Sequence, residues 1–178
     1  LQNAASMAAL AYRERGYVAT VSIPRQEIAD GVVTLKVSEA RYSGATLDPA
    51  STGRIRSELI LARVERAMQV EKAVNTNILD RQILLLNDLP GAQVRAGLAP
   101  GDEEGETRVV LQSEAKPLVT GNLSFDANGA LSTGRDRTTL DLAFNSPNGH
   151  GEQITIAAMG TSGIRYGRVG VSFPVGLD

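Results

Sequence analysis

The sequence predicts an α+β protein whose last third changes to antiparallel strands. The first observation is a phrase that returns: residues 33–40 read VTLKVSEA, and residues 108–115 read RVVLQSEA. Before each copy come, in the same order, a helix-like run, a glycine, a strand-like run, a proline, a polar loop and a second glycine. Elements, glycines and prolines that recur in the same order indicate a repeated supersecondary unit. The second observation is that period-two alternation replaces helical spacing after Pro117.

Composition excludes several classes of protein. The 178 residues carry a net charge of −2 and contain no cysteine, which excludes disulfides and thiolate metal sites. The cationic residues are scattered rather than gathered in a basic patch, so a nucleic-acid partner is not expected. The sequence has no run of about 18 apolar residues, so it predicts no transmembrane helix. It begins at Leu1 within a helix-like pattern, and we therefore expect it to belong to a longer protein.

The first unit has the order helix, strand, loop, strand. Residues 3–15 are predicted to be helical and to end at Gly16, a natural C-terminal stop. Strand-like runs follow at residues 17–23 and 32–39, on either side of a polar loop. The apolar stripe expected to face the core of this helix consists of Ala4, Met7, Ala8 and Ala11.

The second unit, residues 41–116, has the fuller order β-α-α-β-β. A strand at 42–47 precedes two helical stripes, and strands at 92–98 and 107–113 follow. Asn77 is predicted to cap the second helix, with Asp80 in its first turn. The predicted core contains Leu61, Val64, Leu79, Ile83, Val94 and Val109. The first unit shows only the last three of these five elements.

Four alternating segments follow Pro117. Their apolar positions include Leu123, Phe125, Leu140 and Leu142, and polar residues such as Asn122, Ser124, Asp126 and Asp141 occupy the other face. We expect a bulge or strand boundary near Gly167, where the phase of the apolar residues changes. A soluble sandwich would bury the apolar face, whereas an outer-membrane barrel would turn it toward lipid. The pattern alone leaves both solutions open.

The chain shows no catalytic constellation. His150, the only histidine, lies in a predicted turn and lacks the neighbours that a metal site needs. The acidic loop at 101–106 lacks EF-hand spacing, and GTSGIRYG lies between strands rather than opening a helix. We therefore predict no enzyme activity, no cofactor and no metal site.

Three stretches resemble one family. YRERGYVATVSIPRQEIADGVVTLKVSEA resembles the end of the first POTRA (polypeptide-transport-associated) domain of two-partner secretion outer-membrane transporters. This is the haemolysin secretion/activation branch, TpsB, of the Omp85 superfamily. LLLNDLPGAQVRAGLAPGDEEGETRVVL is similar to the end of the second POTRA domain, and GNLSFDANGALSTGRDRTTLDLAFNSPNGHGEQ to the first barrel hairpin. The resemblance implies the C-terminal part of POTRA 1 at 1–40, POTRA 2 at 41–116 and the first barrel strands at 117–178.

The resemblance also implies a place and a role. POTRA domains would lie in the periplasm, and the strands would lie in the outer membrane with lipid around them. The implied partner is a large secreted exoprotein, received unfolded through its N-terminal secretion domain. In POTRA domains the strand at 17–23 tends to form a sheet edge beside a helix, and such an edge can pair with an extended peptide. The candidate client-binding residues are Tyr17, Val18, Ala19, Thr20 and Val21.

Two alternatives stay open. The strand at 17–23 could have a purely structural use, and residues 92–98 form a second candidate edge. The chain could also be the POTRA module of an outer-membrane assembly or insertion factor that acts as a scaffold. Of the two roles, we expect transport of the exoprotein. The chain departs from the family pattern in three ways: its first POTRA domain is partial, it offers only about four barrel strands, and it lacks the family's lid-loop motif.

Overall fold

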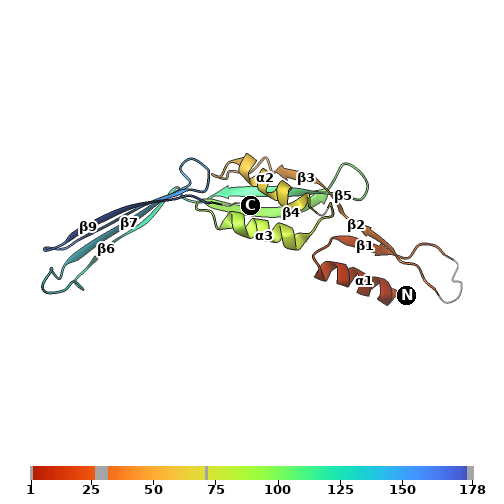
Figure 1. The fold of residues 1–178 in the computed structure, drawn as a ribbon, viewed down its shortest axis with the longest axis horizontal. Coiled ribbons are helices and arrows are strands. Elements are labelled where there is room, and N and C mark those ends of the chain that lie inside the picture. The colour runs from red at the N-terminus through yellow and green to blue at the C-terminus, as the bar shows by residue number, and fades with distance from the viewer. Residues whose placement is uncertain (1, 27–31, 71, 176–178) are drawn as a thin grey trace. The chain divides into compact units, whose positions relative to one another are not determined.

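The computed structural model describes residues 2–26, 32–70 and 72–175 (Figure 1). Its contacts divide the chain into two compact units. Unit 1 comprises Leu1–Ala50, Ile60–Leu85 and Val94–Gln112, and unit 2 comprises Ser51–Leu59, Leu86–Gln93 and Ser113–Asp178. The elements in chain order are α1 (Gln2–Glu14), β1 (Ala19–Ser22), β2 (Lys36–Glu39), β3 (Arg41–Leu47), α2 (Ser57–Met68), α3 (Thr76–Asn87), β4 (Ala92–Pro100), β5 (Glu106–Ala115), β6 (Val119–Asp126), β7 (Arg137–Asn145), β8 (Gln153–Gly160) and β9 (Arg165–Ser172).

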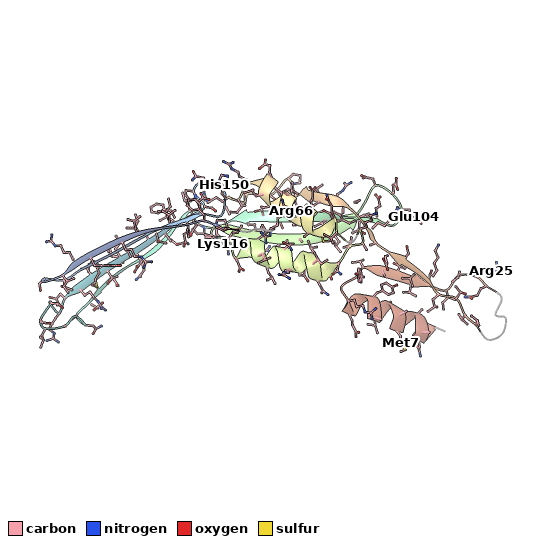
Figure 2. All side chains as sticks on the ribbon, viewed as in Figure 1. Met7, Arg25, Arg66, Glu104, Lys116 and His150 are labelled. Atoms are coloured by element: carbon pink, nitrogen blue, oxygen red, sulfur yellow. The ribbon has the colours of Figure 1, made fainter. Side chains whose placement is uncertain are left out.

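Helix α1 packs beside the β1–β2 pair, but not with the predicted face. The side chains that it partly buries are Ala5, Ala8, Ala9 and Tyr12. Met7, which was expected in the core, is 70% exposed and points away from the β1–β2 pair (Figure 2). Because alanines surround the whole helix, the periodicity did not single out one face, and the predicted stripe was wrong for Ala4, Met7 and Ala11, which are exposed, but right for Ala8. The predicted stop was right, since Gly16 has a φ of +86°.

Strand β2 is shorter than the predicted strand at 32–39. It pairs antiparallel with β1 over four residues, from Ala19 opposite Glu39 to Ser22 opposite Lys36. Before β2, side-chain hydrogen bonds from Gln26 take the place of the backbone hydrogen bonds of a strand pair. The Gln26 side chain donates to the Thr34 carbonyl at 2.8 Å and accepts from the Thr34 N–H at 2.8 Å. This bridge satisfies backbone groups that a longer strand would have used.

The predicted β-α-α-β-β order is confirmed by β3, α2, α3, β4 and β5. Their sheet has the order β3-β5-β4, with β3 parallel to β5 and a register shift between Tyr42 and Ala45. Gly44 lies at this shift with a φ of +121°, a conformation that favours glycine. The result is a sheet with helices against it and with β4 at one edge (Figure 1).

The core of unit 1 lies between these helices and the sheet. Among the predicted core residues, Val64, Leu79, Val94 and Val109 are each at most 4% exposed. Leu61 and Ile83 are only half-buried, so their assignment to the core was wrong. Helix α2 turns Ile60, Val64 and Met68 inward, at spacings of four residues, and this rotation leaves Leu61 on its flank.

The N-cap of α3 is Asn75 rather than the predicted Asn77. The Asn75 side-chain oxygen accepts from the N–H groups of Asn77 at 3.0 Å and Ile78 at 3.4 Å. The first turn of α3 contains no acidic residue, so Asp80 lies beyond the dipole's reach. Both errors come from beginning the helix too late.

In unit 2 the four segments after Pro117 form one antiparallel sheet in the order β6-β7-β8-β9. The register places the predicted apolar residues on one face, with Leu123 opposite Leu140, Leu142 opposite Ile156, and Ile156 opposite Val169. Phe125 on this face is 72% exposed. The expected bulge near Gly167 is absent, because β9 pairs regularly with β8 and simply turns Tyr166 to the polar face beside Met159.

None of the described helices has the length and the apolar character needed to cross a membrane. The predicted boundaries at residues 40 and 116 stay a prediction, since α2, α3, β4 and β5 each contribute to both compact units.

Candidate functional site

The strand β1 offers an unpaired edge within the described part of the chain. It pairs only with β2, in a two-stranded sheet. The Ala40 N–H donates to the Val18 carbonyl at 2.8 Å, so Val18 faces β2. Because backbone groups alternate in direction along an antiparallel strand, Thr20 and Ser22 also face β2, whereas Ala19 and Val21 face outward. The outward groups are therefore those of Ala19 and Val21.

The beginning of this edge is closed by another segment. The Val18 N–H donates to the Val74 carbonyl at 3.2 Å, and the Val74 N–H donates to the Ala40 carbonyl at 2.8 Å. The N–H of Tyr17 is also occupied, because it donates to the Tyr12 carbonyl at 3.0 Å. Of the five predicted residues, Ala19 and Val21 thus present backbone groups at the open edge. The backbone of Thr20 pairs with β2, and the N–H groups of Tyr17 and Val18 already donate to the carbonyls of Tyr12 and Val74.

A groove runs between α1 and β1. It has a volume of about 490 Å³ and is lined by Ala5, Ser6, Ala9, Val21 and Ile23. The three helix residues are small, so the helix leaves room beside the strand. Val21 therefore contributes an outward backbone and a side chain that lines the groove. Sequence reasoning missed the helix side of this groove, although the small residues at positions 5, 6 and 9 were the available signal.

The second predicted edge, at 92–98, is β4. It pairs with β5 alone, and Leu98 is 43% exposed. Strand β1 combines its open edge with an adjoining groove, and this combination makes β1 the better-formed candidate.

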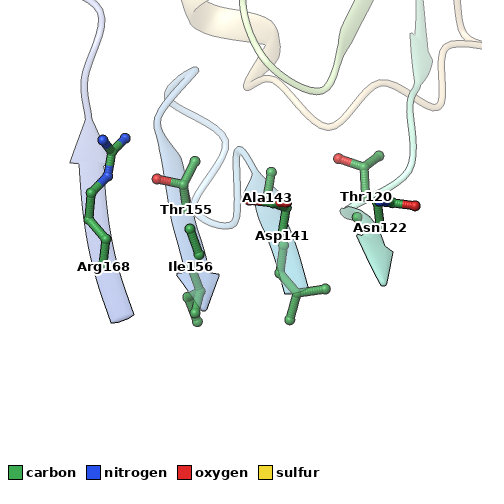
Figure 3. Close-up of a pocket in the computed structure, with 10 residues that line it drawn as sticks. Thr120, Asn122, Asp141, Ala143, Thr155, Ile156 and Arg168 are labelled. Carbon is green, nitrogen blue, oxygen red and sulfur yellow. The ribbon is translucent and has the colours of Figure 1, made fainter. Parts of the chain in front are cut away.

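The polar face of the β6–β9 sheet forms a second hollow, of about 370 Å³. Figure 3 shows residues from all four strands at its wall: Thr120 and Asn122 from β6, Asp141 from β7, Thr155 from β8 and Arg168 from β9. Asn122 lies directly opposite Asp141, and Ala157 separates Asp141 from Arg168. Ala143 and Ala157 lie among these polar side chains, so the face combines polar groups with small apolar ones.

The described residues contain no cluster of three or more His, Cys, Asp or Glu side chains that could hold a metal ion. The acidic loop forms ion pairs instead, from Asp102 to Arg108 at 2.5 Å and from Glu103 to Arg41 at 3.6 Å. Burial raises the pKa of Tyr42 to about 12, with the Glu65 carboxylate contributing, so this phenol stays protonated at neutral pH.

Comparison with known proteins gives relatives across most of the chain. A family model for the POTRA domain, ShlB-type, matches residues 1–40. The chain is 28% identical over 148 residues to the outer membrane transporter CdiB of Dickeya dadantii, a match that covers 83% of this chain and 25% of that protein. It is 23% identical over 163 residues to the heme/hemopexin transporter protein HuxB of Haemophilus influenzae, with 91% and 28% covered.

Among solved structures, CdiB from Escherichia coli superposes with a TM-score of 0.72 at 25% identity, over 99% of this chain and 33% of that one. The chain thus spans about a quarter of the length of the curated relatives that it matches. The fold likeness covers both the helix-containing part and the four-stranded sheet.

Proposed function

We propose that this chain, which has the POTRA and barrel-strand organisation of a two-partner secretion transporter of the Omp85 superfamily, receives an unfolded exoprotein and passes it to a barrel begun by β6–β9. The POTRA domains lie in the periplasm, and the four strands lie in the outer membrane. The relatives CdiB and HuxB are transporters, which supports transport over an enzymatic role.

The observation that carries this proposal is the β1 edge with its groove. An unfolded chain has unpaired backbone donors and acceptors, and the outward groups of Ala19 and Val21 offer matching partners. Backbone pairing needs little side-chain specificity, which suits a client that arrives extended. The groove beside Val21 can accept alternate side chains of the added strand, because successive side chains point to opposite faces.

The β6–β9 sheet supports the second half of the proposal. Its exposed apolar face, with Phe125 and Val169 at 72% and 69% exposure, suits lipid. The opposite face carries the polar side chains of Asn122, Asp141 and Arg168 around a hollow, which suits a water-filled lumen. A soluble sandwich would need a second layer over the apolar face, and the described residues provide none.

Binding to the secreted partner tests the proposal. The full-length protein in detergent would be presented with the amino-terminal region of the exoprotein encoded beside it, either unfolded or prefolded. We expect capture of the unfolded form and weak capture of the folded one. The alternative role as an assembly scaffold predicts binding of unfolded barrel proteins instead. Capture of barrel proteins but not of the exoprotein would replace transport with assembly.

A further inference from the structure

The turn between β7 and β8 is built around a buried carboxylate. Glu152 is 2% exposed, and its side chain accepts from the N–H groups of Asn148 and His150, the latter at 2.8 Å. The Ser146 N–H donates to the Glu152 carbonyl at 2.7 Å, and the Ser146 hydroxyl accepts from the Gly151 N–H at 2.8 Å. Because Glu152 satisfies backbone donors from inside the loop, the turn has one defined shape.

This turn fits closely against residues 51–59 of the same unit. The Arg56 N–H donates to the Gly149 carbonyl at 3.0 Å. Gly149 has a φ of +80°, and a Cβ there would lie 2.9 Å from the Arg54 carbonyl oxygen and 3.2 Å from Arg56 Cγ. Only glycine meets both the backbone conformation and the close approach.

The same turn and the adjoining end of β7 also meet the segment that follows α3, within unit 2. A Cβ on Gly151 would lie 3.0 and 3.2 Å from the two methyl carbons of Leu89, and one on Gly91 would lie 3.2 Å from the Asn145 carbonyl oxygen. Both glycines have a φ of +82°. The turn is therefore packed against two separate segments that precede β5, with little room at any contact.

Asn145 joins the turn to the start of β6. Its side-chain nitrogen donates to the Pro117 carbonyl and to the Thr120 hydroxyl, both at 3.2 Å, and its oxygen accepts from the Gln153 side chain at 2.8 Å. Asn145 is 8% exposed. Within unit 2, hydrogen bonds consequently join the β7–β8 turn and the adjoining end of β7 to the start of β6 and to the segment at 54–56, while the segment at 89–91 packs closely against them.

We propose that the β7–β8 turn is a positioning joint that fixes the base of the second POTRA domain to the first two barrel hairpins. Glu152 is its positioning residue, since it holds the turn in the shape that places the Gly149 carbonyl opposite the Arg56 N–H. The proposal rests on the transport function and deepens it. A client bound at the POTRA edges reaches the pore only if the joint keeps the POTRA domain aligned with the barrel opening. The client itself does not contact Glu152.

Hydrogen exchange of the Arg56 amide in the full-length protein tests the joint directly. Two variants weaken it by different means: Gly149→Ala introduces the clash with Arg54, and Glu152→Gln leaves one of the two N–H donors without an acceptor. Gly105→Ala is the matched control, because Gly105 has a φ of +82° but a Cβ there meets nothing within 4 Å. We expect Arg56 exchange at least tenfold faster in the first two variants and unchanged in the control.

Three further measurements separate the joint from the transport function and from general damage. Secretion of the exoprotein should fall several-fold in Gly149→Ala and Glu152→Gln, while affinity for the unfolded exoprotein and the heat resistance of the barrel stay unchanged. Unaltered Arg56 exchange in both variants, or full secretion despite accelerated exchange, would overturn the joint. Loss of barrel heat resistance in both would show a general folding role and would also overturn it. Failure of the wild-type protein to bind the exoprotein would instead defeat the transport proposal.

Discussion

Replacing Ala19 with proline is the sharpest perturbation of the proposed client edge. Proline lacks an N–H, and at this position the missing donor is one that points away from β2. The β1–β2 ladder uses the neighbouring residues, Val18 and Thr20, so it should survive the change. The side chain at position 19 is half-buried and changes little in size.

The expected loss of affinity for the exoprotein can be estimated from one backbone hydrogen bond. A typical backbone hydrogen bond contributes about 0.5–1.5 kcal/mol net, which corresponds to a roughly 2- to 13-fold weaker Kd. The proline ring also occupies the position of an added strand, so the upper part of this range is expected. Fluorescence anisotropy with a labelled amino-terminal region of the exoprotein would measure the Kd.

Two matched variants make the result decisive. Ala19→Ser keeps the donor and should bind as the wild type does. Thr20→Pro removes a donor that faces Ser38 in the ladder, so it should lose circular-dichroism signal and stability as well as binding. A folded Ala19→Pro protein that binds with the wild-type Kd would refute the role of this edge, and β4 would become the leading candidate for the client edge.

Three other predictions concern packing, pH and the membrane. Ile60→Ala should lower the free energy of unfolding by about 2–5 kcal/mol in a denaturant titration, and Ile83→Ala by less, because Ile60 is fully buried and Ile83 is not; equal losses would contradict the assigned helix faces. Burial raises the pKa of Glu152, but the N–H groups of Asn148 and His150 outweigh it, and the net pKa is lowered. Arg56 protection should therefore hold above the ordinary glutamate pKa of about 4.3 and fall as pH drops through the folded value, whereas Glu152→Gln should show no such step. Spin labels on single cysteines in the full-length protein should report oxygen access from lipid on one face and water access on the other; the first set is Leu123, Phe125, Leu140 and Leu142, and the second is Asn122, Ser124, Asp126 and Asp141. Burial of Phe125 away from both would end the barrel interpretation.

The order of the elements could be predicted because it depends on local signals. Glycines, prolines and the change from helical to period-two spacing mark where each element ends, and they placed the β-α-α-β-β order and the four later strands correctly. The faces of the helices were harder. Alanines all around α1 and adjacent apolar residues in α2, Ile60 and Leu61, give patterns that fit more than one rotation. Packing against the sheet then decides which face of each helix is buried, and the residues of the sheet are distant in the sequence.

The candidate edge likewise has features that local sequence predicts and features that depend on distant contacts. That residues 17–23 form a strand could be predicted from composition, and that the strand lies at an edge could be predicted from family resemblance. Which backbone groups face outward depends on the register of β1 against β2, in which the Ala40 N–H donates to the Val18 carbonyl from 22 positions away in the sequence. Where the open edge begins depends on Val74, which is 56 positions from Val18 and occupies the Val18 N–H. No window of sequence contains that information.

The repeated punctuation acquires a physical meaning from the contacts that its glycines make. In unit 1 the Gly16 carbonyl accepts from the N–H and hydroxyl of Thr76, at 2.8 and 3.1 Å, and a Cβ at Gly16 would lie 2.5 Å from the Asn75 side-chain oxygen. In unit 2 the Gly91 carbonyl accepts from the Lys116 N–H at 3.3 Å, and a Cβ there would meet Asn145. Each glycine thus lies after a helix in a left-handed conformation, and each of the two carbonyl groups accepts a hydrogen bond from a segment distant in the sequence. A flexible linker would need neither the left-handed conformation nor the close approach, so the repetition encodes two hydrogen-bonded joints as well as two similar folds.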